Sequence, residues 1–313
     1  MFNHLHLHSV YSFGEALGPV KDYIAEAKRN KQTALAKTDI EVLCGSWQFY
    51  SECKKEKIKP ILGQEFYVAA NDKAEIKDSS NSKHRKLVLL AKNNQGWKNL
   101  SILSSIAFTK YAYYHPRIDS KLLYKYREGL IALSGGLDGV IGSYWSLGEE
   151  KKALETARRY KAIFEEDFYL EAFPTPGQNQ IDYNRFLIEL RKVDGYKIVA
   201  TNNVFYPKQE QAKYYPYLLM IKQNQRENEF RGGNQQLSDS FYLMSEPEMR
   251  EAFENQGFEE KQINRWIVSV EEIVNKIEDI EFEKSFKLPE FLSFKDVKDK
   301  EVELEVSGAS LLD

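Results

Sequence analysis

The chain has 313 residues, of which 42% are hydrophobic, and it carries a formal net charge of −3. A chain of this length can bury a large core, either as one α/β domain or as one domain with an appendage. The near-neutral charge excludes a strongly basic nucleic-acid binder, so we expect only indirect contact with DNA. The sequence has no apolar run of the ~18 residues typical of a transmembrane helix, no signal-peptide profile and, with only Cys44 and Cys53, no disulfide framework, which together predict a cytoplasmic protein without a membrane partner.

Up to residue 207, short apolar runs alternate with amphipathic segments. The apolar runs predict strands at 2–7, 34–39, 59–69, 86–92, 129–135, 168–173 and 197–202. The amphipathic segments predict helices at 20–30, 44–55, 98–108, 149–164 and 183–193. Apolar strands separated by helices are typical of a parallel sheet that is buried on both faces, and we expect this sheet to close as a barrel.

After residue 207 the pattern changes. The remaining elements are expected to be helices at 208–224 and 260–277, a loop at 226–240, and a short strand and helix over 241–255. Ser245 is the expected N-cap of the helix within 241–255, and Pro247 lies in the first turn of that helix. The predicted organisation is a β/α core over 1–207, a helical and loop extension packing on it over 208–291, and an irregular tail over 292–313.

Three of the five histidines of the chain, His4, His6 and His8, lie at its start. Residues two apart on a strand lie on one face roughly 6.6 Å apart, so we expect these rings to point the same way. Neutral imidazoles at this spacing can bind one or two divalent metals. The alternative is that they are hydrogen-bonded inside a polar barrel mouth.

Six segments follow one another in a particular order, and they are HLHLHSVYS, ALAKTD, KPILGQEFYVA, LVLLAKNNQGWKNL, GLIALSGG and KIVATNNVFY. This series resembles the N-terminal polymerase-and-histidinol-phosphatase (PHP) domain of the bacterial DNA polymerase III alpha subunit, from residue 2 to about residue 291. The later FYLMSEPEMREAF and FKLPEF segments are also similar to that subunit. The resemblance implies a distorted, seven-stranded parallel β/α barrel with a C-terminal helical extension and with metal ligands at the carboxyl ends of the strands.

The resemblance also implies where the metal ligands would lie. The positions that keep a ligand type are His6, His8, Glu15 and Glu65. The positions where the family's ligand is replaced are Ile40, Lys86, Gly136, Asn203 and Phe205, with Asp39 retained just before Ile40. Isoleucine, glycine and phenylalanine offer no lone pair to a metal, and a charged lysine repels one. A multinuclear phosphoesterase needs its metals to activate water and to hold the phosphate, so we expect no catalytic residues and no metal cofactor here.

We hypothesise that Lys86 places an ammonium group where a divalent ion would lie, opposite Glu15 and Glu65. Ile40 and Phe205 would then fill the rest of the vacated pocket. One alternative is that Lys86 is a surface lysine at the start of a strand. Another is that a shift in register brings His84 to the ligand position instead.

Two functions follow from the resemblance. The first is a catalytically silent PHP module of a polymerase III alpha subunit, a DNA-directed DNA polymerase and nucleotidyltransferase of DNA replication. Its partners would be the remainder of the alpha subunit and the proofreading exonuclease subunit, for which it would act as scaffold and docking surface. The second is a residual metal-dependent 3′–5′ exonuclease or phosphoesterase, with Zn, Mn or Mg held by His6, His8 and Glu65.

No acidic strand motif of a polymerase palm occurs in the sequence, so we expect this chain not to polymerise DNA by itself. A third interpretation sets the family aside and describes a soluble α/β barrel enzyme of unknown substrate. The ordered series of motifs makes that interpretation less attractive than the other two.

Overall fold

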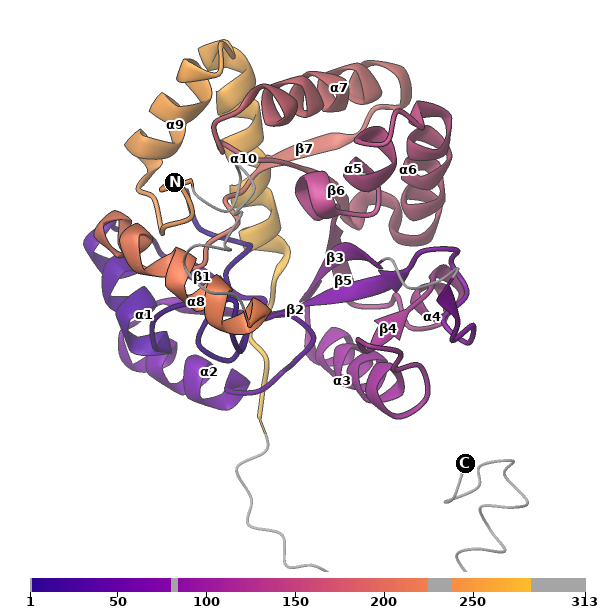
Figure 1. The fold of residues 1–313 in the computed structure, drawn as a ribbon. Coiled ribbons are helices and arrows are strands. Elements are labelled where there is room, and N and C mark those ends of the chain that lie inside the picture. The colour runs from indigo at the N-terminus through magenta and orange to yellow at the C-terminus, as the bar shows by residue number, and fades with distance from the viewer. Residues whose placement is uncertain (1, 80–83, 225–237, 283–313) are drawn as a thin grey trace, which may run out of the picture. The chain divides into compact units, whose positions relative to one another are not determined.

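The computed structural model describes residues 2–79, 84–224 and 238–282 (Figure 1). One compact unit spans Met1–Ile280, and Glu281–Asp313 is a second unit. Within the described ranges, no helix combines the length and the apolar character that a membrane crossing requires. The predicted tail over 292–313 and most of the predicted loop over 226–240 lie outside the described residues.

The strands are β1 (Ala34–Lys37), β2 (Lys59–Ala69), β3 (His84–Ala91), β4 (Arg117–Ile118), β5 (Leu130–Leu133), β6 (Phe168–Ala172) and β7 (Lys197–Ala200). The α-helices of the described residues are α1 (Val20–Arg29), α2 (Ser46–Lys55), α3 (Asn94–Thr109), α4 (Ser120–Lys125), α5 (Gly142–Trp145), α6 (Glu150–Phe164), α7 (Gln178–Asp194), α8 (Tyr215–Gln223), α9 (Glu246–Asn255) and α10 (Glu260–Lys276). Short 3₁₀ turns include η2 (Gly136–Asp138), η3 (Glu165–Asp167) and η4 (Gln209–Tyr214).

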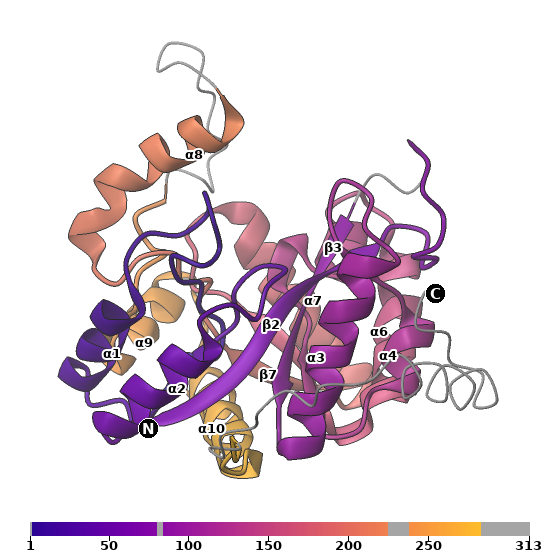
Figure 2. The same cartoon turned by 90° about the horizontal axis from the view of Figure 1, so that it is seen from below.

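These strands form one curled, seven-stranded sheet with the order β1-β2-β3-β5-β6-β7, and β4 pairs with β2. Figure 2 shows the long strand β2 curving across the molecule. The pairs β1–β2, β5–β6 and β6–β7 are parallel. β3 runs antiparallel to both of its neighbours, β2 and β5. The fold is therefore mixed α/β, and the expectation of an entirely parallel sheet is wrong at β3.

The connection into β3 explains its direction. A parallel neighbour of β2 would need a crossover, which is usually a helix, whereas an antiparallel neighbour can follow a direct turn. Residues 70–79, the described part of this connection, contain no α-helix. The run KLVLLAK is buried on both faces, and such a run has the same apolar composition whichever way it points.

The N-terminal segment, residues 2–9, is called the His segment below. It does not form the expected strand and makes only an isolated bridge between Leu7 and Val204. Its backbone still bonds on two sides: Thr38 N donates to Leu7 O at 2.8 Å, and His8 N donates to Val204 O at 2.9 Å. The His segment therefore lies between β1 and the chain that follows β7.

Helices cover the outer face of the sheet, with α1 and α2 near β1, α3 against β3, and α7 and α10 against β7 (Figure 1). α9 begins at the predicted cap, because Glu248 Oε2 accepts bonds from Ser245 N at 2.7 Å and Ser245 Oγ at 2.6 Å. The short strand expected just before it is reduced to a bridge between Tyr206 and Tyr242. The predicted division at residue 207 lies inside the first compact unit and stays a prediction.

Candidate metal centre

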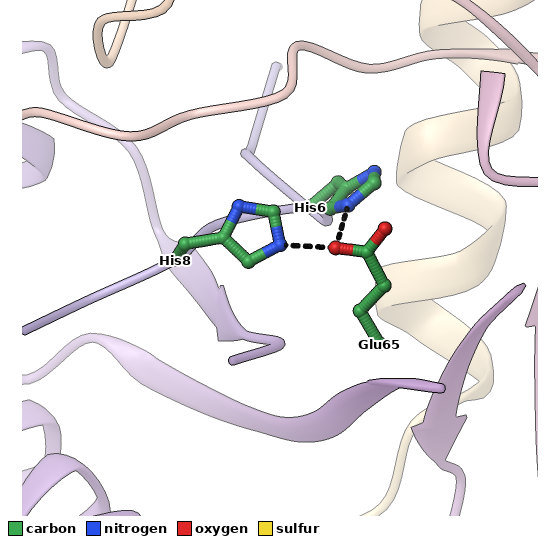
Figure 3. A group of neighbouring side chains, drawn as sticks. All are labelled: His6, His8 and Glu65. Atoms are coloured by element: carbon green, nitrogen blue, oxygen red, sulfur yellow. Dashed lines mark hydrogen bonds and ion pairs between the residues drawn. The ribbon is translucent and has the colours of Figure 1, made fainter. Parts of the chain in front are cut away.

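Two histidines and one glutamate meet inside the sheet (Figure 3). His6 and His8 come from the His segment, and Glu65 comes from the middle of β2. Glu65 Oε2 lies 2.7 Å from His8 Nε2 and 3.6 Å from His6 Nε2. All three side chains are buried, and one ligand atom from each lies within 4.8 Å of the others.

Glu171 holds the other side of His6, and the sequence analysis missed this residue. His6 Nδ1 lies 3.0 Å from Glu171 Oε1, which also accepts a bond from Thr201 Oγ1 at 2.9 Å. The second oxygen of Glu171 accepts from Gly135 N at 2.6 Å. A carboxylate on one ring nitrogen fixes the orientation of a histidine ring, so Nε2 of His6 is directed toward Glu65. One feature of the sequence could have indicated Glu171, namely that it is the one charged residue in the apolar run FYLEA, which forms a buried strand.

Lys86 in β3 approaches the same glutamate. Its Nζ lies 3.2 Å from Glu65 Oε1, and its side chain is only 16% exposed. Burial lowers the pKa of Lys86, but the Glu65 carboxylate outweighs burial and raises this pKa above its usual value. Burial likewise raises the pKa of Glu65, but Lys86 and His8 outweigh it and hold this pKa well below its usual range. The two groups therefore form a charged pair at the edge of the site.

The two histidines of the site differ in charge. Burial lowers the pKa of His6, but Glu171 and Glu65 outweigh burial and raise this pKa to about 9. For His8, burial outweighs the attraction of Glu65, and the pKa is lowered. Two positively charged groups, Lys86 and His6, therefore flank the Glu65 carboxylate at neutral pH.

Apolar rings fill the space around these charges. Phe205 stacks on His8 with ring centres 4.6 Å apart, and Ile40 belongs to the same buried apolar cluster as Phe205. Gly136 has a φ of +65°, and a Cβ added there would lie 2.0 Å from the ring of Phe173. The Phe173 ring in turn lies 5.9 Å from the ring of His6. A side chain at position 136 therefore cannot enter the site in this arrangement.

Two acidic residues from the predicted ligand set are engaged elsewhere. Asp39 accepts bonds from Ser9 N and Ser12 Oγ, each at 2.6 Å, and pairs with Lys37 at 2.7 Å. It thereby anchors the end of the His segment. Glu15 forms its ion pair with Lys222 in α8, so the prediction that it lies opposite Lys86 as an ion-pair partner is wrong.

The other histidines and the amide do not join the site. His4 Nε2 lies 2.8 Å from Met244 O, and His4 is not in the group that His6 and His8 form with Glu65. His84 packs its ring against Tyr67, 5.3 Å away, rather than replacing Lys86. Asn203 keeps a buried Oδ1 that makes no hydrogen bond within the described part of the chain.

The donor set fits one divalent ion better than a cluster. Two histidines and one glutamate are a ligand set that zinc accepts, and His6 Nε2 makes no hydrogen bond to another described residue. Against this, an ammonium group lies 3.2 Å from Glu65, and positions 40, 136 and 205 carry no metal donor. These residues do not fit the multinuclear cluster that phosphate hydrolysis would use.

The chain is similar in sequence to a known protein family and to several curated proteins. Residues 4–173 match the family model of the PHP domain. The DNA polymerase III subunit alpha of Aquifex aeolicus (strain VF5) is 36% identical over 272 residues, which cover 84% of this chain and 23% of that protein. Its counterpart from Helicobacter pylori (strain ATCC 700392 / 26695) is 32% identical over 262 residues, which cover 80% of this chain and 21% of that protein. The chain thus spans less than a quarter of the length of these curated relatives.

Among solved structures, a two-domain protein from Bacteroides vulgatus, described as containing a predicted PHP-like metal-dependent phosphoesterase, is 13% identical with a TM-score of 0.41. The match covers 82% of this chain and 63% of that one. A likeness of this size carries no weight for the function.

Proposed function

The chain belongs to the PHP domain family, and we propose from this premise that it is the PHP module of a bacterial DNA polymerase III alpha subunit. Its role in DNA replication is structural: it supports the rest of the alpha subunit and offers a docking surface to the proofreading exonuclease. The curated relatives support the first of these partners, since the two compared above are both alpha subunits. The resemblance alone supports the exonuclease as the second partner.

One observation carries the proposal of a silent centre, namely the Lys86 ammonium 3.2 Å from Glu65 Oε1. In an active phosphoesterase this carboxylate would be free to hold a cation. Here a protein cation lies against it, so the carboxylate is neutralised without any Lewis acid being present. Phe173, Phe205 and Ile40 then occupy volume that ligands and substrate would need.

The His segment has a structural part in this proposal. It carries His6 and His8 and bonds to both β1 and the chain after β7. We propose that it closes the curled sheet into the distorted barrel of the family. The charged pair at Lys86 and Glu65 then links β3 to β2 inside that barrel.

The second candidate is a residual metal-dependent 3′–5′ exonuclease or phosphoesterase. It is favoured by the grouping of His6, His8 and Glu65, whose ligand atoms lie within 4.8 Å of one another. A single ion bound there would polarise water or a phosphate oxygen. In that case Glu171 would orient His6, and Lys86 would neutralise part of the charge on Glu65.

Hydrolysis assays separate the two candidates. The full chain, purified without chelator, is incubated with end-labelled single-stranded DNA and with p-nitrophenyl phosphate in Mg²⁺, Mn²⁺ or Zn²⁺. The silent module predicts product release no greater than that of a matched His6→Ala/His8→Ala variant. Release that is lost in this variant and in EDTA would establish the second candidate instead.

The docking role needs a separate assay. The full chain and the proofreading exonuclease of the same cell are mixed and run by gel filtration. Co-elution in a defined ratio is the expected result. Independent elution at micromolar concentrations would remove the exonuclease from the proposal and leave the silent centre untouched.

A further inference from the structure

A groove of about 530 Å³ is lined by residues of α7, the start of β7 and α10. Its floor includes Trp266 and Ile198, which are buried in the unit. Val268 stands at its edge with 61% of its surface exposed. The apolar surface that the groove offers to a ligand is therefore mainly that of Val268, above a floor whose side chains are already packed.

This groove is separate from the candidate metal centre. β7 begins at Lys197, which lines the groove, and ends just before Thr201, which bonds to Glu171 in the centre. Four residues of strand separate these positions by roughly 13 Å. A ligand in the groove would consequently not touch the histidines.

The rim of the groove is mainly basic. Arg191, Lys261 and Arg265 are exposed, and within the described residues none of them forms an ion pair. The fourth basic residue, Lys197, is already paired with Glu272 at 2.6 Å. Three exposed cations thus surround the apolar floor, opposed only by Glu260 among the unpaired acids of the lining.

We propose that this groove binds a segment of a partner protein in which acidic side chains alternate with apolar ones. The apolar side chains would cover Val268, and the carboxylates would meet Arg191, Lys261 and Arg265. Charge complementarity selects this occupant over a basic peptide. The exposed Val268 and the two glutamates of the lining, Glu260 and Glu272, favour a peptide over the uniformly charged backbone of a nucleic acid. This inference does not depend on the silence of the metal centre.

The test uses labelled peptides and the full chain. Fluorescence polarisation is measured with the acidic apolar peptide EDLFEDLL, with KKLFKKLL, with EDGSEDGS and with an eight-nucleotide single-stranded DNA. The proposal predicts that EDLFEDLL binds most tightly of the four and that added salt weakens it. Equal or tighter binding of any of the other three probes overturns the proposal, as does absence of EDLFEDLL binding at high micromolar concentration.

Two matched variants locate the site. Lys261→Glu/Arg265→Glu reverses two charges on the rim, and Lys121→Glu/Lys151→Glu makes the same change at exposed positions in α4 and α6. The rim variant is expected to weaken EDLFEDLL binding by about tenfold, and the control variant by less than about twofold. Equal weakening in the two variants would contradict the assignment. A photo-crosslinking residue at position 268 supplies a readout that does not rely on charge, and failure to crosslink the bound peptide would likewise overturn it.

Discussion

At the scale of single residues, the centre holds its carboxylates with cations and hydrogen-bond donors that the protein itself provides. Glu65 has Lys86 on one oxygen and His8 on the other. Glu171 has His6 and a backbone amide. A buried carboxylate without such partners would lose several kcal/mol of solvation, so each of these contacts offsets a cost that burial imposes.

Replacing Lys86 with methionine tests this arrangement. Lys86→Met keeps a side chain of similar length but leaves Glu65 without its cation. We expect a loss of about 3 kcal/mol in the free energy of unfolding, measured by urea denaturation.

The matched control is Lys98→Met, at an exposed lysine in α3, for which a change within about 0.5 kcal/mol is expected. The double variant Lys86→Met/Glu65→Gln is expected to recover part of the loss, because it removes both charges together. If Lys86→Met is as stable as Lys98→Met, the pair does not hold the centre.

Gly136 tests the packing beside His6. Gly136→Ala introduces a Cβ 2.0 Å from the Phe173 ring at a φ of +65°. We expect a loss of about 3 kcal/mol by thermal or urea unfolding, since both backbone strain and overlap oppose the new methyl group.

Combining Gly136→Ala with Phe173→Ala separates the two causes. Removing the ring relieves the overlap, so the loss in the double variant is expected to be smaller than the sum of the two single losses. Strict additivity would show that Phe173 does not occupy the space of a side chain at position 136.

The residues of the site differ in how far the sequence could predict them. His6, His8, Glu65 and Lys86 stand at motif positions, and the structure brings all four together. Glu171 was not predicted as a site residue, because the sequence of an apolar strand does not show toward which face its one glutamate points. The strand expected over 2–7 does not form, and His4 bonds to Met244 O instead of lying beside His6 and His8.

At the scale of elements, the spacing of apolar residues predicts most helices and strands. For β3 it predicts the strand but not the direction in which the strand runs. Its burial identifies it as a strand, but its direction depends on the connection that precedes it. α9 shows the opposite case, in which a local signal decides the outcome. Ser245 and Pro247 mark its first turn in the sequence, and the structure forms the cap there with Glu248 as the acceptor.

The α9 cap gives a prediction about pH. Burial raises the pKa of Glu248, but bonds from Ser245 and Tyr242 outweigh it and lower this pKa below its ordinary value of 4.5. The contribution of the carboxylate is therefore complete above about pH 5 and is lost as the pH falls through the lowered pKa. Glu248→Gln is expected to cost about 1 kcal/mol at neutral pH, and this difference from the unmutated chain should shrink below pH 4.5.

The measurement is a series of urea unfolding curves from about pH 7 to about pH 3.5. Glu254→Gln, near the exposed end of the same helix, is the control and should differ little from the unmutated chain at any pH. A Glu248→Gln difference that stays constant across the series would show that the charge of Glu248 does not stabilise the cap.

At the scale of the whole molecule, the centre joins parts of the chain that are far apart in sequence. Its side chains come from the His segment, β2, β3 and β6, and Phe205 follows β7. The charged and aromatic contacts therefore connect both ends of the curled sheet. These contacts give the centre a role in holding the fold together, in line with the structural role proposed above.

Metal content is the most direct test of the central claim that protein charge replaces the metal. The full chain is purified without chelator, exposed to Zn²⁺ and Mn²⁺, passed through gel filtration and analysed by inductively coupled plasma mass spectrometry, with Lys86→Met measured in parallel. We predict far less than one ion per chain in the unmutated protein, and increased uptake in Lys86→Met because Glu65 is then free to bind a cation. One or more ions retained per unmutated chain, and lost on substitution of His6 and His8, would contradict the account.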